Sequence, residues 1–229
     1  LENSLRRLRV DVIPLYFLHW PDPHTPLADT LEAIVRCQDV GKIRHFGLSN
    51  FSATQIREVC AATSVAAVQV QYSLIDRSAE MEIFPCCQEL GITFVPFSPV
   101  GRGYLADEPL DPNGYKDGDL RRSFPRFTDP HFSANLGLLK KARQHASDLG
   151  CTIAQLALAW TLAQDKSAVP IPGTTNLKHL EDNFNAASIV LPAEVLATLN
   201  DEFSPEAVSG PRYSEPAQAS VTTEKFAFE

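Results

Sequence analysis

The chain has 229 residues and a net charge of −8, from 28 acidic and 20 basic residues. A chain of this length can form one domain with a sizeable core, and its acidic balance argues against a nucleic-acid partner and favours a small molecule. No apolar stretch is long enough to cross a bilayer and no signal peptide opens the chain, so we expect no membrane contact and a soluble, cytoplasmic protein.

The opening of the chain predicts a short helix followed by a buried strand. Leu5 and Leu8 have helical spacing within residues 2–8. The apolar run PLYFLHWPD predicts a strand over about residues 11–19, because parallel strands covered by helices on both faces are apolar throughout. His19 stands at the carboxyl end of this strand, where α/β folds carry their chemistry. Taken alone, the residue fits a structural histidine that ends a strand at least as well as it fits a catalytic one.

The next units repeat the alternation of helix and strand. Thr25 is the expected N-cap of a helix that ends at Gly41, and residues 42–50 (KIRHFGLSN) predict the second strand. Ser52 and Gln55 have the spacing of a capping box for the following helix. Two further strands are predicted over residues 65–73 (VAAVQVQYS) and 92–100 (ITFVPFSPV), with a helix over about residues 79–90 between them.

A long segment without periodicity follows, from Gly101 to about residue 129. Loops of this length within a compact domain are usually functional. We expect its three arginines, Arg121, Arg122 and Arg126, to form a solvated face rather than an anion site.

The last part of the chain predicts mainly helices around one more strand. Helices are expected over about residues 131–149 and 152–164, and SAVPIPG, residues 167–173, predicts the fifth strand. A helix capped by Thr175 should turn an apolar face inward, formed by Leu177, Leu180 and Phe184. Another helix is expected from Pro192 to Phe203, and the tail after it is expected to be irregular.

Regular alternation of strand and helix predicts parallel strands joined by right-handed crossovers. No GxGxxG motif follows a strand, which weakens the case for a Rossmann fold and leaves a (β/α) barrel. Such a barrel needs eight strands, but the sequence predicts only five. Since the chain starts at Leu1 and its only methionine is Met81, we expect the missing units upstream of Leu1 or in another chain.

The five cysteines show no metal-binding or disulfide pattern. They are odd in number and have no CxxC spacing, and most fall on apolar helix faces. We therefore expect reduced core thiols and no metal site. The residues are Cys37, Cys60, Cys86, Cys87 and Cys151.

Polar and aromatic side chains occur at or near the predicted carboxyl ends of all five strands. In a barrel these ends meet at one rim, and together they offer what a nicotinamide dinucleotide requires: amide and hydroxyl partners for the carboxamide, a ring for stacking, and a helix N-terminus for phosphate. Each residue alone also fits a turn former, a core ring or a cap. The groups are His19 with Trp20, Ser49 with Asn50, Gln69 with Tyr72, Phe97 with Ser98, and Gly173 with Thr174 and Thr175.

The motifs LYFLHWPD, GKIRHFGLSNF, VQYS, FVPFSPVGRG and VPIPGTTNLKHLEDN, in this order and spacing, resemble the aldo-keto reductase family. The resemblance covers nearly the whole chain and is closest to the branch with an RGYL or RGFL loop. It implies an α/β protein with a (β/α)8 TIM-type barrel, of which this chain, residues 1–229, is a single N-terminally incomplete domain carrying the fourth to eighth strand units. It also implies reduction of an aldehyde or ketone with NADPH, with NADH possible.

The resemblance assigns roles to individual residues. His19 corresponds to the active-site histidine that orients the substrate carbonyl, and Trp20 and Tyr213 to walls of the substrate pocket. Asn176 differs from the arginine of many relatives, which weakens the preference for NADPH, although Lys178 could supply positive charge. The expected cofactor-binding residues are Ser49, Asn50 and Gln69 at the carboxamide; Phe97 at the nicotinamide ring; Ser98, Val100 and Arg102 at the pyrophosphate; and Gly173, Thr174, Thr175, His179, Asp182 and Asn183 at the adenosine end.

The family's proton-donating tyrosine, and the lysine and aspartate that support it, lie on the first three units and have no counterpart here. Reduction of a carbonyl needs a proton donor poised near neutral pH, so we expect this chain alone to be slow. Two alternatives stay open: a pseudoenzyme that binds the dinucleotide without catalysis, and a fragment that needs a complementing partner. The carbonyl compound and the oligomeric state are not fixed by the sequence.

Overall fold

The structure is a computed structural model, and it describes residues 1–107 and 111–227. Its centre is a parallel sheet formed by β1 (Ile13–Leu18), β2 (Ile43–Ser49), β3 (Ala67–Gln71) and β4 (Thr93–Phe97). The strands lie side by side in the order in which they occur in the chain. A doubly wound sheet would reverse that order at one point, whereas a barrel does not. The architecture is therefore an α/β fold with a parallel sheet, consistent with a TIM-type barrel.

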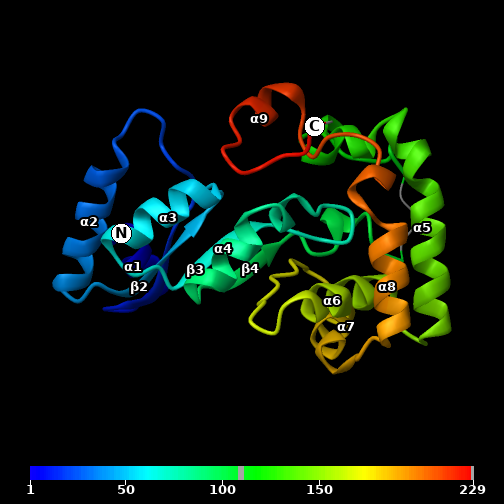
Figure 1. The fold of residues 1–229 in the computed structure, drawn as a ribbon, viewed down its shortest axis with the longest axis horizontal. Coiled ribbons are helices and arrows are strands. Elements are labelled where there is room, and N and C mark those ends of the chain that lie inside the picture. Colours follow the sequence, from blue (N-terminus) through cyan, green and yellow to red (C-terminus); the bar gives the residue numbers. More distant parts are fainter. Residues whose placement is uncertain (108–110, 228–229) are drawn as a thin grey trace.

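Helices follow the strands and cover the sheet (Figure 1). α5 (His131–Asp148) and α8 (Ala193–Glu202) lie at the end of the molecule farthest from α2 (Leu27–Asp39), and β3 and β4 lie between the two ends. The capping box of α3 is confirmed: Ser52 accepts from the Gln55 backbone, and the Gln55 side chain accepts from the Ser52 backbone. The helices are α1 (Glu2–Leu8), α2 (Leu27–Asp39), α3 (Ala53–Ala62), α4 (Ile83–Leu90), α5 (His131–Asp148), α6 (Ile153–Gln164), α7 (Leu177–Asn185), α8 (Ala193–Glu202) and α9 (Glu215–Ala219).

The fifth predicted strand is much shorter than expected. Val169 and Ile171 donate backbone hydrogen bonds to the carbonyls of Phe94 (2.9 Å) and Pro96 (3.0 Å), but the pairing amounts to a single parallel bridge between Phe97 and Ile171. The alternate positions, 170 and 172, are prolines and have no N–H to donate toward the outer side. On β4, Pro96 has no N–H to donate back to the carbonyl of Val169, so a second bridge to β4 cannot form there. The prediction of a regular strand over residues 167–173 was wrong for this reason.

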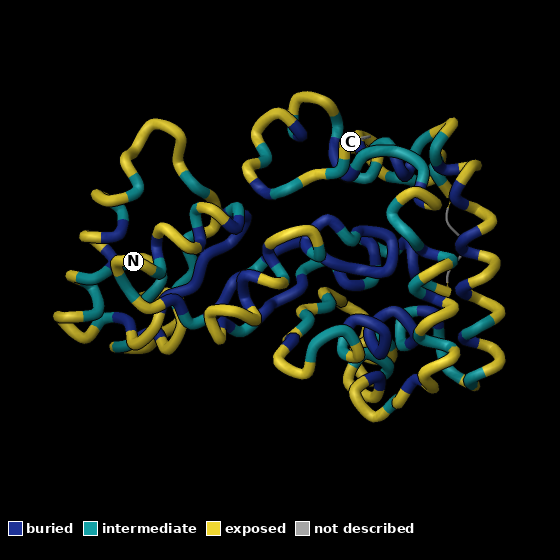
Figure 2. Tube along the Cα trace, in the orientation of Figure 1, coloured by how far each residue is buried: buried dark blue, intermediate teal, exposed yellow. Residues whose placement is uncertain are grey.

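The core lies between the sheet and the helices that cover it, and the buried residues run along the middle of the molecule (Figure 2). Tyr72 packs against Phe94 and Trp160, with ring centroids 5.5 Å and 5.3 Å apart. Its hydroxyl donates to Glu80 at 2.7 Å, and burial raises the pKa of Tyr72 above its usual range. The Trp160 indole donates to Asn200 at 2.8 Å, which ties α6 to α8. The aromatic cluster therefore joins the sheet to the second half of the chain.

Two helix caps differ from the prediction. α2 begins after Pro26, and the hydroxyl of Thr25 instead donates to Asp22. α7 is capped by Asn176, whose side chain accepts from the backbone of Lys178 at 2.9 Å, and not by Thr175. In both cases the cap lies one residue later than the hydroxyl that the sequence offered.

The apolar face of α7 is exposed, contrary to expectation. Leu177, Leu180 and Phe184 are 77%, 55% and 83% exposed. Among the residues that the structure describes, no element covers this face, so the prediction that these side chains turn inward was wrong.

The tail after α8 is more ordered than predicted, since it contains α9 and is tied to the body. Thr222 donates to the carbonyl of Asn50 at 3.0 Å, and the Glu224 side chain accepts from the backbone of Ala53 at 2.8 Å. Arg126, expected in a solvated face, is buried and donates to the carbonyls of Ile75 (2.6 Å) and Gly210 (2.9 Å). This arginine fixes the long loop against the start of the tail.

Within the described part of the chain, no helix is long and apolar enough to cross a membrane. All five cysteines are unpaired thiols. Burial raises the pKa of Cys87 to about 12, which makes it an unreactive core residue.

Gly47 is required where β1 and β2 pack together. A Cβ at this position would lie 2.5 Å from Cε1 of Phe17 and 2.8 Å from the carbonyl oxygen of Ala67. We expect Gly47→Ala to lower the free energy of unfolding by about 1–3 kcal/mol, because the new methyl group overpacks the site. Urea unfolding measures this change.

Gly137 provides the matched control. It lies on the exposed side of α5, and a Cβ there would meet no atom within 4 Å. Gly137→Ala should raise the free energy of unfolding by about 0.5–1 kcal/mol, because alanine is the better helix former. Equal effects of the two substitutions would contradict the packing argument.

Candidate functional site

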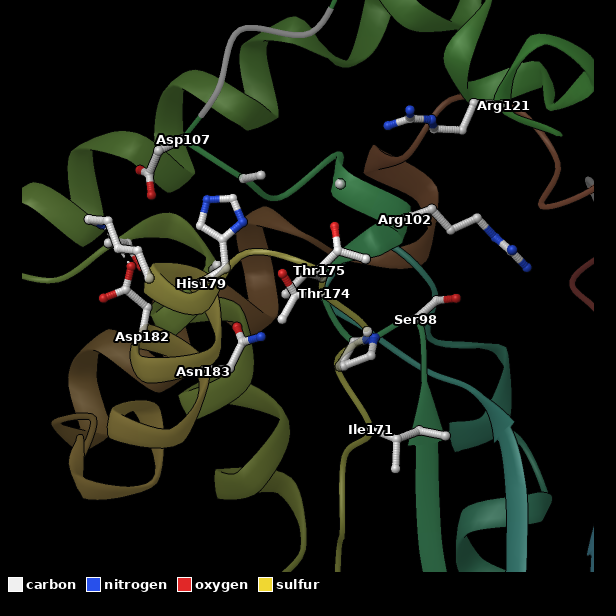
Figure 3. A pocket seen from close by; sticks show the side chains of 18 residues that line it. Ser98, Arg102, Asp107, Arg121, Ile171, Thr174, Thr175, His179, Asp182 and Asn183 are labelled. Atoms are coloured by element: carbon white, nitrogen blue, oxygen red, sulfur yellow. Dashed lines mark hydrogen bonds and ion pairs between the residues drawn. The ribbon is translucent and has the colours of Figure 1, made fainter. Parts of the chain in front are cut away.

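A cavity of about 770 Å³ lies beyond the carboxyl end of β4, between the following loop and the first turns of α7 (Figure 3). Nine of the thirteen residues predicted to bind the cofactor line it. They come from two segments far apart in the sequence. These nine are Ser98, Val100, Arg102, Gly173, Thr174, Thr175, His179, Asp182 and Asn183.

The backbone at the site is strained in places. Asn50 (φ 63°), Ser98 (φ 52°) and Arg102 (φ 58°) all adopt the left-handed conformation, which non-glycine residues rarely take. Asn50 directly follows β2 and Ser98 directly follows β4. Such conformations are retained mainly at ligand-binding and catalytic positions, where the surrounding structure holds them.

One side of the cavity offers groups suited to phosphate. Thr174 and Thr175 contribute their side chains next to the N-terminus of α7, where free backbone amides and the helix dipole favour an anion (Figure 3). Lys178 and His179 lie in the first turn, and Lys178 also forms an ion pair with Asp182 at 2.9 Å. The hydroxyl, amide and cationic groups at this end can hold a polyanion.

The long loop supplies the opposite wall, and sequence reasoning missed part of it. Arg121 lines the cavity, stacks over the ring of Tyr115 at 4.3 Å and pairs with Asp119 at 2.7 Å. Hydrogen bonds from Arg121 lower the pKa of Asp119 to about 2, so the pair stays ionised at neutral pH. Asp107, Thr152 and Ile171 also line the cavity. A solvated face was predicted for Arg121, and no sequence motif marks it as a cavity residue.

The predicted carboxamide-binding residues lie near this cavity but do not line it. Ser49 and Gln69 are direct neighbours on β2 and β3, and Phe97 lies opposite both Gln71 and Ile171. Ser49 and Asn50 are buried, and the Asn50 amide donates to Ser49 Oγ and to the carbonyl of His19, both at 3.0 Å. The strand ends are therefore joined across β1, β2, β3 and β4.

His19 and Trp20 lie at the other end of this row. His19 is exposed, directly after β1, and Trp20 is 44% exposed. Trp20 lines a separate cavity of about 150 Å³ together with Phe51 and Gln55. The structure places His19 at the same edge of the sheet as the cofactor-binding candidates but outside the 770 Å³ cavity.

Tyr213 is buried, and its hydroxyl donates to Gln71 Oε1 at 2.7 Å. It does not line the 770 Å³ cavity. Gln71, the last residue of β3, also accepts from Arg102 at 3.1 Å. Gln71 lies within the VQYS motif, but the sequence offers no signal for these contacts, because they join β3 to the distant tail and loop.

With this geometry established, the comparisons with known proteins define the class. The chain matches the Aldo/keto reductase family over residues 1–202. It is 38% identical over 224 residues to an aldo-keto reductase, yakc [NADP(+)], of Schizosaccharomyces pombe, covering 96% of this chain and 66% of the relative. The chain belongs to the aldo/keto reductase family.

Solved structures agree with this assignment. The glycerol dehydrogenase AKR11B4 from Gluconobacter oxydans is similar with a TM-score of 0.81 and 26% identity, covering 89% of this chain and 63% of that protein. An aldo/keto reductase from Klebsiella pneumoniae, solved with NADP and acetate, is similar with a TM-score of 0.68 and 29% identity. The match covers 93% of this chain and 66% of that protein. The chain thus spans slightly less than two thirds of the length of these relatives.

Asn50 allows the strain at the site to be measured. Asn50→Ala removes both amide hydrogen bonds and leaves a Cβ in the left-handed region, so we expect it to lower the free energy of unfolding by about 2–3 kcal/mol. Asn50→Gly loses the same bonds without the backbone penalty and should cost about 1–2 kcal/mol less than alanine. Equal losses in urea unfolding would show that the left-handed backbone carries no strain.

Proposed function

We propose that this chain forms the dinucleotide-binding part of an NADPH-dependent carbonyl reductase, corresponding to the fourth to eighth strand units of a (β/α)8 barrel. The observation that supports this most directly is the convergence of nine expected cofactor residues on one cavity beside the N-terminus of α7. The S. pombe relative is named for NADP(+), and the K. pneumoniae relative was solved with NADP. The chain's substrate would be a small aldehyde or ketone, and its net charge of −8 argues against nucleic acid.

The cavity fits the phosphate groups of such a cofactor. Thr174 and Thr175 add hydroxyls to the α7 terminus, and Lys178, His179 and Arg121 add positive or hydrogen-bonding groups. A polyanion is the ligand that these donors suit best.

The nicotinamide would extend from this cavity along the strand ends. Ser49, Asn50 and Gln69 would hold the carboxamide, and Phe97 would support the ring. NADPH, when bound, supplies the hydride for carbonyl reduction. His19, at the end of β1, would orient the substrate carbonyl by donating a hydrogen bond to its oxygen.

The lack of an effective proton donor limits the catalysis expected from this chain alone. The tyrosine, lysine and aspartate that the family uses have no counterpart in the motif order of this sequence. A lone histidine is a poor substitute, because efficient proton transfer needs an acid held at the reacting oxygen. We therefore propose slow reduction by the isolated chain, with a non-catalytic dinucleotide-binding protein as the alternative.

We also propose that the chain belongs to the branch of the family with the RGYL loop and that the protein is cytoplasmic. Tyr104 and Leu105 of this loop are buried, and Tyr104 packs against Phe127 and Phe132 with ring centroids 5.5 Å and 6.0 Å apart. The loop is therefore anchored beside the cavity. Five unpaired cysteines favour a reducing compartment.

A second candidate, a fragment that needs a complementing partner, is favoured by the exposed apolar edges. Val169 and Ile171 are 53% and 42% exposed at one edge of the sheet, next to the exposed face of α7. At the other edge Val10 and Leu15 are 40% and 37% exposed. Contiguous apolar surface of this kind usually marks an interface. We propose that further strand–helix units of an aldo-keto reductase barrel cover both edges.

NADPH binding tests the first candidate. Fluorescence titration of the full chain should detect NADPH, with weaker binding of NADH. Lys178→Ala should raise the Kd for NADPH about three- to tenfold and change the Kd for NADH little. The substitution removes a cation from the adenosine end, where NADPH carries a 2′-phosphate that NADH lacks. Lys140→Ala, on the exposed side of α5, is the control. Failure of the wild-type chain to bind either dinucleotide would refute the proposal and its non-catalytic alternative.

Complementation tests the second candidate. The part of the S. pombe relative that this chain does not match, added as a separate polypeptide, should form a 1:1 complex detected by light scattering after size exclusion. Leu177→Asp combined with Phe184→Asp should abolish the complex, since it places charges on the apolar face of α7. Leu120→Asp alters an exposed leucine of the long loop and should leave the complex intact.

The same complex separates an enzyme from a pseudoenzyme. Reduction of nitrobenzaldehyde by the complex, but not by either part, would support the reductase. A complex that binds NADPH without turnover would favour the pseudoenzyme. Absence of a complex, or self-association of the chain alone through these faces, would contradict complementation.

A further inference from the structure

Tyr213, Gln71 and Arg102 form a short hydrogen-bonded relay, in which the side chains of Tyr213 and Arg102 both donate to Gln71. The Tyr213 hydroxyl donates to Gln71 Oε1 at 2.7 Å, and the same oxygen accepts from Nη2 of Arg102 at 3.1 Å. Gln71 and Tyr213 are both 9% exposed, so water competes little with these bonds. The relay connects the C-terminal tail, the end of β3 and the loop after β4.

Aromatic rings enclose the guanidinium of Arg102. Its central carbon lies 4.7 Å from the centroid of Phe124, 5.8 Å from that of Tyr213 and 6.0 Å from that of Phe97. Phe124 and Tyr213 pack edge to face, with centroids 5.9 Å apart. The cation is thus held by π faces and by a hydrogen bond to Gln71, so the position of Gln71 Oε1 helps to set where the guanidinium lies.

The conformation of Arg102 explains why its position matters to the cavity. Its backbone is left-handed (φ 58°), as is that of Ser98 (φ 52°), and both residues line the cavity. Figure 3 shows the Arg102 side chain directed away from Thr174 and Thr175. The side chain therefore anchors the strained loop from behind, while the loop itself forms the wall.

The tail also contacts the other expected end of the cofactor. Thr222 donates to the carbonyl of Asn50 at 3.0 Å, and Arg212 donates to the carbonyl of Glu224 at 3.0 Å. The tail, which carries α9, runs beside the strand ends in Figure 1. One segment thus contacts residues expected at the carboxamide and at the pyrophosphate.

We propose that Tyr213 and Gln71 are positioning residues that hold Arg102, and through it the loop of residues 98–103, in the shape that binds the pyrophosphate of the dinucleotide. This inference rests on the proposed function and gives Tyr213 a role different from that of a substrate-pocket wall. Loss of the Tyr213 hydroxyl leaves Gln71 free to rotate and removes the constraint that keeps Arg102 between its rings. The loop can then relax from the left-handed conformation.

The test compares two ligands that differ in the pyrophosphate. NADPH contains it, and adenosine 2′,5′-bisphosphate has the adenosine end without it. Tyr213→Phe keeps the ring and should raise the Kd for NADPH about three- to tenfold, the effect of one hydrogen bond, while the Kd for adenosine 2′,5′-bisphosphate stays unchanged. Both are measured by titration of the full chain, with the thermal midpoint recorded for every variant.

Variants of Gln71 provide the rescue. Gln71→Leu should reproduce the loss seen with Tyr213→Phe, whereas Gln71→Glu keeps an oxygen that accepts from both partners and should restore NADPH binding. Tyr104→Phe is the matched control: this tyrosine is also buried and donates to a backbone carbonyl, that of Phe132 at 3.3 Å, but does not line the cavity.

The outcomes separate this inference from the proposed function. Wild-type binding of NADPH with unchanged affinity in Tyr213→Phe would overturn the positioning role and leave the function standing. Equal weakening of both ligands would also overturn it, because that pattern reports a general loss of structure. Absence of NADPH binding by the wild-type chain would remove the function and this inference together.

Discussion

Parallel pairing in chain order is the constraint on which the rest of the structure depends. When strands run parallel and follow one another across the sheet, all their carboxyl ends meet at one edge. Register pairs Leu18 with Leu48, Ser49 with Gln69, and Gln71 with Phe97, so each strand end adjoins the next. Residues separated by long stretches of sequence thereby form one row. The cavity beside α7 lies at the far end of that row, after β4.

The same constraint explains how much the sequence could predict. Apolar runs ended by polar residues identified the four strands, and the capping box at Ser52 identified the start of α3. Because the strands are parallel, the residue after each run could be assigned to the site edge without knowing any contact. Ser98, Gly173, Thr174 and Thr175 were chosen in this way and line one cavity. The other five expected cofactor residues on its lining were assigned by the family resemblance. Their roles in binding stay predictions.

What the sequence could not predict depends on partners distant in the chain. SAVPIPG has the composition of a strand, but it pairs with β4 through a single bridge, because Pro96 of β4 has no N–H to donate to Val169. The inward face expected for α7 follows from its apolar spacing, yet spacing does not show whether a covering element exists. Arg121 belongs to no motif, and Gln71 lies within VQYS without an assigned role; the contacts of both result from packing of the long loop and the tail. Such contacts are tertiary and leave no local pattern.

The two faces of α7 connect the apolar edge to the cavity. Lys178, His179, Asp182 and Asn183 face the cavity, whereas Leu177, Leu180 and Phe184 lie on the opposite, exposed side. This division follows from helical periodicity, since positions three and seven apart share a face. Anything that covers the apolar face must also fix the position of the helix whose N-terminus faces the cavity.

Ile171 strengthens this connection, because it lines the cavity and is also exposed at the sheet edge. Under the proposed function, binding at the edge and binding in the cavity would therefore act on the same short segment and the same helix. By thermodynamic linkage, a partner that tightens dinucleotide binding must itself bind more tightly when the dinucleotide is present. On the other side of the cavity, the hydrogen bonds from Tyr213 and Arg102 to Gln71 tie the loop after β4 to β3 and the tail. The cavity thus has one wall stabilised within the chain and one wall, α7, whose outer face is left uncovered by the described residues.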